Sequence, residues 1–265
     1  MNRVVVNVAT NRYVKGQERL TEALALLGEE YQVWRNKLPP GSPAHEETPY
    51  AFKAWALEAA RKSGHTLLMW ADASIVPIAK LDPIWEYTEA HGVWLADNGW
   101  KNSQWTCNAA YMDLFAHEWK AEAFRQAWNH QHDTLHPEQN LGNGVDYALG
   151  NLRKINRRIK HVVATGFALD VQHPTGAQFL IEYLRLAKTN AFKGPWWNFN
   201  GERPDYAKSA GAAPCGPPEC LGHRHDQTAA SVIAWRLGIP LTQSPKFFTY
   251  DGHQTEETIL IAKGI

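Results

Sequence analysis

Titratable side chains gather before one predicted helix, in the sequence CLGHRHDQTAASVIAWRLGI at residues 220–239. Cys220, His223, His225 and Asp226 belong to the residue types that bind metal ions or move protons. The chain then continues as an amphipathic run. Three explanations compete for this stretch: an ordinary helix cap, a zinc site, and the acid–base end of an active site.

The zinc hypothesis needs Cys215, Cys220, His223 and His225 as its four ligands. Their spacing, C-x4-C-x2-H-x-H, matches none of the common structural zinc patterns. The cap hypothesis needs only Asp226, whose carboxylate would accept backbone N–H bonds at the helix start. In the third hypothesis the same carboxylate stands on a rigid helix start after a flexible loop and acts as a general base toward a hydroxyl group.

Polar residues also follow two predicted strands. The first group is Thr10, Asn11, Arg12 and Tyr13, and the second is Asp72, Ala73 and Ser74. Ligands of open parallel sheets bind outside the carboxyl ends of the strands, so both groups are candidates for a binding site. A carboxylate such as Asp72 can hold a divalent cation or a ribose hydroxyl, although a turn cap is the ordinary alternative.

The elements that must position these groups follow a regular order in the first third of the chain. Strands are predicted at 3–10, 31–37 and 66–74. A helix that follows the polar loop 11–16 and a second helix at about 49–62 lie between them. Leu20, Leu24 and Leu27 recur on one face of the first helix, and Gly28 ends it. This β-α-β-α-β order predicts an α/β fold with a mostly parallel central sheet flanked by helices and a Rossmann-like N-terminal half.

The rest of the chain is less regular. Helices are expected near 81–91, 116–130 and 144–160, and strands at 92–97 and 161–170. A further helix is expected to begin at Thr175, which forms a capping box with Gln178. The loop 190–222 is rich in Gly, Pro and Trp and is predicted to be a mobile lid. After the helix of the opening stretch come the strand KFFTY, a turn at Asp251-Gly252-His253 and the strand TILIAK.

Composition limits the classes of function. Lys plus Arg and Asp plus Glu both number 27, so the zero net charge argues against a protein whose whole surface binds nucleic acid. The three cysteines are too few for a disulfide framework, and no apolar run could span a bilayer, which predicts a cytoplasmic protein. Twelve tryptophans are an unusually high number for a chain of this length. Those flanked by polar residues could bind the flat faces of sugars or nucleic-acid bases, namely Trp100, Trp105, Trp196 and Trp197.

The strand end WADAS resembles the DxD motif of nucleotide-sugar glycosyltransferases with the GT-A fold. Other elements of that family are resembled, in the same order, by the segments VVVNVATNRYVKGQERLTEAL, ATGFALD and HRHDQTAASVIAWRLGI. The resemblance implies a single domain over 1–265, with a nucleotide-binding half at 1–100 and an acceptor-binding half at 101–265. It implies donor contacts from residues 10–13 and 72–74. Asp226 would be the catalytic base, and Trp196, Trp197, His223 and His225 would contact the acceptor.

The resemblance also implies a divalent cation, Mn²⁺ or Mg²⁺, held by Asp72 and by His253 in the sequence YDGH. Ser74 stands where the family's motif has its second aspartate, and serine is a weaker, neutral ligand. Two alternatives therefore stay open. Either Asp72, His253 and diphosphate oxygens hold the ion, or cationic side chains such as Arg12, Lys15 and the basic segment 153–160 offset the diphosphate charge.

The sequence thus predicts a glycosyltransferase that moves a sugar from a nucleotide-sugar donor, most simply a UDP-sugar, to a hydroxyl of a glycan, a small molecule or a nucleic acid. Two other hypotheses remain. A nucleic-acid-binding protein, or a transferase acting on a nucleic-acid base, would use the sequence LRKINRRIKH and the tryptophans. A zinc-stabilised interaction module would use the cysteines and histidines of the opening stretch.

Overall fold

The computed structural model describes residues 2–119, 149–194 and 219–264. Its strands are β1 Arg3–Ala9, β2 Tyr31–Arg35, β3 Leu67–Ala71, β4 Ile75–Pro77, β5 Val93–Lys101, β6 Lys160–Asp170, β7 Thr242–Gln243, β8 Phe247–Tyr250 and β9 Thr258–Ala262. Its α-helices are α1 Val14–Leu27, α2 Phe52–Lys62, α3 Asp82–His91, α4 Tyr111–Leu114, α7 Pro174–Leu186, α8 Asn190–Lys193 and α10 His225–Arg236. The predicted β-α-β-α-β order of the first third is confirmed.

The strands form a mixed, mostly parallel central sheet in the order β2-β1-β3-β6-β5-β7. β1 pairs in parallel with β2 and β3, and β5 pairs in parallel with β7. β6 alone runs the other way, antiparallel to both β3 and β5. The carboxyl end of β3 therefore lies beside the middle of β6, where Asp72 N donates to Thr165 O over 2.8 Å.

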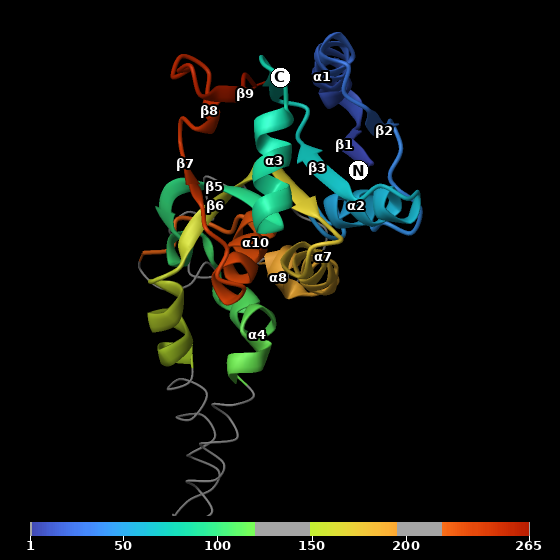
Figure 1. Ribbon diagram of the computed structural model, residues 1–265. Helices are drawn as coiled ribbons and strands as arrows, with labels where there is room; N and C mark the ends of the chain where they lie inside the picture. The colour runs from blue at the N-terminus through green and yellow to red at the C-terminus, as the bar shows by residue number, and fades with distance from the viewer. Residues whose placement is uncertain (1, 120–148, 195–218, 265) are drawn as a thin grey trace, which may run out of the picture.

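Helices cover both faces of this sheet, as expected for an α/β fold (Figure 1). The side chains of β1 alternate: Val4, Val6 and Val8 face a core shared with α2, α7 and α10. Val5 faces a second core shared with α1, α3 and a small sheet of strands β4, β9 and β8. The two cores hold the sheet rigidly from both sides, so groups at strand ends are fixed in position.

The structure differs from the sequence prediction at a helix cap, at two short strands and in the loop 190–222. His173 rather than Thr175 caps α7, because its ring accepts a hydrogen bond from Thr175 N while Pro174 takes the first helical position. Strands β4 and β7 were missed because they are too short to show a period. Part of the predicted loop 190–222 is the short helix α8, and residues 195–218 lie outside the described residues.

The predicted helices at 116–130 and 144–160 are only partly described. The chain is helical at 116–119 and at 149–156, and residues 120–148 lie outside the described part. Among the helices that the structure describes, none has both the length and the apolar composition needed to cross a bilayer.

Candidate functional site

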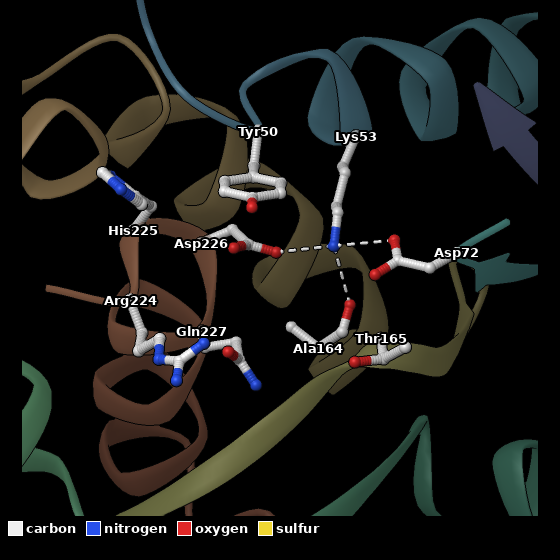
Figure 2. A pocket seen from close by; sticks show the side chains of 9 residues that line it. All are labelled: Tyr50, Lys53, Asp72, Ala164, Thr165, Arg224, His225, Asp226 and Gln227. Carbon is white, nitrogen blue, oxygen red and sulfur yellow. Dashed lines mark hydrogen bonds and ion pairs between the residues drawn. The ribbon is translucent and has the colours of Figure 1, made fainter. Parts of the chain in front are cut away.

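A pocket of about 300 Å³ opens at the carboxyl end of β3, on the side of the sheet covered by α2 and α10. Its wall comes from four parts of the chain: the start of α2, the end of β3, the middle of β6 and the start of α10 (Figure 2). The residues that line it are Tyr50, Lys53, Asp72, Ala164, Thr165, Arg224, His225, Asp226 and Gln227. Asp72 and Asp226, predicted from separate motifs, thus share one pocket.

Lys53 joins the two carboxylates. Its Nζ lies 3.0 Å from Asp72 Oδ1 and 2.8 Å from Asp226 Oδ2, and it donates a hydrogen bond of 2.9 Å to Ala164 O (Figure 2). The side chain is only 3% exposed. Burial lowers the pKa of Lys53, but the charges of Asp226 and Asp72 outweigh burial and raise the pKa above its usual value. Lys53 is therefore an ammonium group at neutral pH.

Asp72 is the more exposed of the two carboxylates, at 29% against 5% for Asp226. Its Oδ1 accepts from Trp70 Nε1 over 2.7 Å as well as from Lys53. These two donors come from the buried strand β3 and from α2, so they fix the orientation of the carboxyl group. The remaining oxygen, Oδ2, is left as the acceptor available to a ligand in the pocket.

Asp226 occupies the first turn of α10 and lies almost fully inside the protein. Burial raises the pKa of its carboxyl group, Lys53 opposes that effect, and Asp72 adds to it, so the net direction is upward. The pKa of the neighbouring, fully buried Tyr183 is also raised, chiefly by burial and then by the charge of Asp226. A carboxylate with a raised pKa is a stronger base, as general base catalysis requires.

Two residues of the pocket wall hold left-handed backbone conformations that side chains other than glycine rarely adopt. Tyr50 has φ of 60° and His225 has φ of 40°. Their rings lie 5.7 Å apart, and Tyr50 also contacts His45 at 4.8 Å between ring centroids. Such conformations cost free energy and are concentrated at binding and catalytic sites. The strain supports a functional rather than purely structural pocket.

Arg224 lines the pocket from the residue before α10 and is exposed. Its guanidinium lies over the Trp105 ring, 4.5 Å from the centroid, which holds the side chain in place by a cation–π contact. Within the described part of the chain, no carboxylate forms an ion pair with it. Arg224 is therefore a cation available to an anionic ligand.

The histidines of the opening stretch are bound to backbone carbonyls of α8. His223 Nε2 donates to Ala191 O over 2.9 Å, and His225 Nδ1 donates to Phe192 O over 2.6 Å. Burial lowers the pKa of His223 to about 4, so it stays neutral. Cys215 lies outside the described residues, and among the residues that are described no three His, Cys, Asp or Glu side chains are grouped as metal ligands.

The other predicted donor residues lie near the pocket but do not line it. Residues 10–13 leave β1 in a short 3-10 helix, and Asn11 N donates to Asn36 Oδ1 over 3.1 Å. Burial and then the charge of Asp226 raise the pKa of Tyr50, and Lys53 opposes that rise. Asp72 and, last, Tyr13 add to the rise, so Tyr13 lies near Tyr50. This segment therefore flanks the pocket.

Ala73, Ser74 and His253 are placed differently. A β-carbon on Gly16 would collide with Ala73 O, so α1 is packed directly against this turn. Ser74 O accepts from Lys263 N over 2.9 Å, which ties the turn to the end of the chain. His253 is exposed in the turn after β8 and does not line the pocket. The acceptor candidates Trp196 and Trp197 lie outside the described residues.

Two of the five basic side chains in the segment 153–160 form ion pairs in the described part of the chain. Arg157 Nε lies 2.5 Å from Glu219 Oε1, and Lys160 Nζ lies 2.9 Å from Asp97 Oδ2. These contacts reduce the charge that the segment offers to a nucleic acid or a diphosphate. No contact within the described residues brings it to the pocket wall.

Sequence reasoning missed Lys53 and Tyr50. The buried residues of α2 are Lys53, Ala54, Ala56, Leu57 and Ala60. Lys53, Ala56, Leu57 and Ala60 follow the i, i+3, i+4, i+7 spacing of one helix face, so a lysine in register with small apolar residues was the signal.

Comparisons with known proteins assign no family. No family model matches the chain, and no curated protein matches it. Among solved structures it is similar to a glycosyltransferase involved in the glycosylation of the major capsid of PBCV-1, with 11% identity and a TM-score of 0.39 over 99% of this chain and 92% of that chain. An identity and a TM-score this low transfer no activity, so the function has to be inferred from the pocket.

Proposed function

We propose that this chain is a glycosyltransferase that moves a sugar from a nucleotide-sugar donor, such as a UDP-sugar, to an acceptor hydroxyl. One observation carries the proposal: Asp72, expected on the donor side, and Asp226, expected at the acceptor hydroxyl, line the same pocket and bind the same ammonium group. A transferase needs both substrates within bonding distance of each other, and a single pocket meets that requirement.

The charge of the pocket suits a ligand that carries hydroxyl groups. Lys53 neutralises only one of the two carboxylates, so Asp72 and Asp226 together retain an excess of acceptor oxygens. Ionised carboxylates only accept hydrogen bonds, and sugar hydroxyls are well suited to donate them. In this proposal Asp72 Oδ2 accepts from a hydroxyl of the donor ribose or sugar.

The diphosphate of the donor needs positive charge in the same pocket. Arg224 lines it without a carboxylate partner among the described residues. The first turns of α2 and α10 both contribute to the wall, and helix N-termini favour anions. In this proposal Arg224 binds the diphosphate and stabilises the negative charge that grows on it as it leaves.

The reaction follows from these roles. The acceptor oxygen attacks the anomeric carbon, a new C–O bond forms, and the bond between that carbon and the diphosphate oxygen breaks. The electron pair leaves with the diphosphate, and the hydroxyl proton passes to Asp226. Because Asp226 would activate the acceptor directly, a single in-line displacement would invert the configuration at the anomeric carbon.

A thermal-shift screen of nucleotides and nucleotide sugars tests the proposal. A ligand that binds only the folded state stabilises it by about 2.7 kcal/mol at 100 times its dissociation constant. We expect UDP or a UDP-sugar to raise the melting temperature of the native protein and to raise it less in Asp72→Asn. If no nucleotide shifts the native protein, or if Asp72→Asn responds equally, the proposal is wrong.

A further inference from the structure

The ammonium group of Lys53 has the surroundings of a bound cation. Three oxygen atoms from three different elements contact it: Asp72 Oδ1 at 3.0 Å, Asp226 Oδ2 at 2.8 Å and Ala164 O at 2.9 Å. Ala164 O accepts a hydrogen bond from Nζ, and the two carboxylate oxygens form ion pairs with it. Lys53 is thus surrounded by oxygens of the kind that a metal ion at this place would need.

Packing prevents Lys53 from leaving this position. The Tyr50 and Trp70 rings each lie 5.2 Å from Nζ, measured to their centroids, which places cation–π contacts on the ammonium group. Trp70 also donates to Asp72 Oδ1, so one indole orients both the cation and one of its carboxylates. The side chain belongs to the buried face of α2 and is almost fully buried.

We propose that Lys53 takes the place of the divalent cation, so that this pocket binds its ligand without a metal ion. A second cation bound to Asp72 Oδ1 or Asp226 Oδ2 would lie beside the ammonium group, and like charges at that distance in a buried site repel strongly. The neutral Ser74 and the exposed His253, the other expected ligands, do not line the pocket. The residues of the described pocket therefore do not fit a divalent cation while Lys53 is present.

Lys53 would act as a positioning residue in this arrangement. It holds Asp72 and Asp226 at fixed places around one point charge, as a metal ion holds its ligands. Arg224 then supplies the charge that faces the ligand directly, because it is the residue of the pocket wall whose cationic group is exposed. The inference rests on the proposed function for the identity of the ligand, but not for the metal-binding measurement that follows.

Direct titration with Mn²⁺ alone tests the inference. Binding is read from the loss of the free-ion signal in electron paramagnetic resonance, for the native protein, Lys53→Ala and the double variant Lys53→Ala/Asp72→Asn. We expect no Asp72-dependent Mn²⁺ binding to the native protein. Lys53→Ala opens the space between the two carboxylates and should bind one equivalent of Mn²⁺. The double variant should bind Mn²⁺ at least about tenfold more weakly than Lys53→Ala, because it also lacks one charged ligand.

Lys53→Met provides the matched control, because it removes the charge but fills the space. It should bind Mn²⁺ more weakly than Lys53→Ala. The inference is overturned if the native protein binds one equivalent of Mn²⁺ that Asp72→Asn abolishes, or if folded Lys53→Ala binds none. Should Lys53→Ala fail to fold, the native protein and Asp72→Asn decide the question alone. A native protein that binds no nucleotide sugar while Lys53→Ala gains Mn²⁺ would refute the proposed transferase and leave this inference standing.

Discussion

Helix α10 carries a charge cluster at each end. The two clusters differ in their balance of charges, and this difference assigns ligand binding to one and stability to the other. At its start, Asp226 shares Lys53 with Asp72. At its end, Arg236 contacts Glu118 over 2.9 Å and Glu182 over 3.8 Å. Both clusters place one cation between two carboxylates, and the first lines the pocket at the end of β3 whereas the second does not contribute to that pocket.

The difference lies in how each cluster is balanced. Arg185 lies 2.8 Å from Glu182, so the cluster at Arg236 has two cations for two carboxylates. Arg236 also donates to Leu114 O over 2.9 Å, and its planar fork joins α10 to α7 and to the chain after α4. Among the described residues, Lys53 is the only cation that forms an ion pair with Asp72 or Asp226, and Asp72 lines the pocket while partly exposed. An unbalanced, partly open cluster fits ligand binding, whereas a balanced one fits stability.

The largest expected difference between the clusters concerns catalysis. The N-cap of α10 is Arg224 and no side chain caps the helix, so the cap hypothesis for Asp226 is wrong. Asp226→Asn keeps the size of the side chain but cannot take a proton. We expect transfer to fall by about 10²- to 10⁴-fold, the usual contribution of general base catalysis. Glu118→Gln, the matched change at the other end of α10, should leave transfer unchanged. Full transfer by Asp226→Asn in a product assay would remove Asp226 from the mechanism.

The second largest expected difference between the two clusters concerns the free energy of unfolding. Lys53→Met leaves two carboxylates inside the protein without a counter-charge, and breaking a buried ion pair in this way costs about 3–5 kcal/mol. Arg236 is more exposed, at 19%, and its carboxylates can reach water, so Arg236→Met should cost about 1–3 kcal/mol. Urea unfolding at neutral pH measures both. A larger loss at Arg236 would contradict the proposed order.

Affinity for the ligand should depend on the arginine that stands apart from both clusters. Arg224→Gln removes the exposed guanidinium of the pocket wall, and charge-assisted hydrogen bonds contribute enough for affinity to fall by about 10- to 100-fold. The melting temperature without ligand should not change. Calorimetric titration with UDP measures the first effect, and Arg236→Gln serves as the control that changes stability without affinity. Equal UDP affinity of Arg224→Gln and the native protein would exclude Arg224 as a diphosphate contact.

Local patterns made the framework of this fold predictable from sequence. The β-branched run at residues 3–9 and the leucine spacing of α1 are each determined by neighbouring residues. Gly28 ends α1 in the left-handed conformation, with φ of 75°, that glycine adopts most easily. The positions of Asp72 and Asp226 at the ends of elements were predictable for the same reason.

The joining of those two carboxylates was not predictable. Lys53, Asp72 and Asp226 come from distant parts of the chain, and a lysine in an amphipathic helix ordinarily faces water. Its burial depends on the carboxylates that surround it, which only the folded structure brings together. The left-handed Tyr50 has the same origin, because packing around the pocket, rather than its own preference, imposes that conformation.

The smallest expected effect is a dependence of stability on pH that has opposite signs at two buried aspartates. Burial raises the folded pKa of Asp226 above its ordinary 3.8. Folding therefore favours the protonated form, and the stability that Asp226 contributes is lost as pH rises from about 4 through its folded pKa. Because asparagine does not titrate, the stability of Asp226→Asn should improve relative to the native protein over that range. The gain should be about 1.4 kcal/mol for each unit by which the pKa of Asp226 in the folded protein exceeds its pKa in the unfolded chain.

Asp97 provides the control of opposite sign. Burial acts to raise its pKa, but hydrogen bonds from Lys160, Gly99 N and Gln243 outweigh burial and lower the pKa below 3.8. The stability that Asp97 contributes is present above that value and is lost as pH falls through its folded pKa. Asp97→Asn should therefore lose stability relative to the native protein as pH rises from about 3 to 5. Urea unfolding of the native protein and both variants between pH 3 and 7 should give slopes of opposite sign, and slopes of the same sign would show that Lys53, rather than burial, dominates the proton affinity of Asp226.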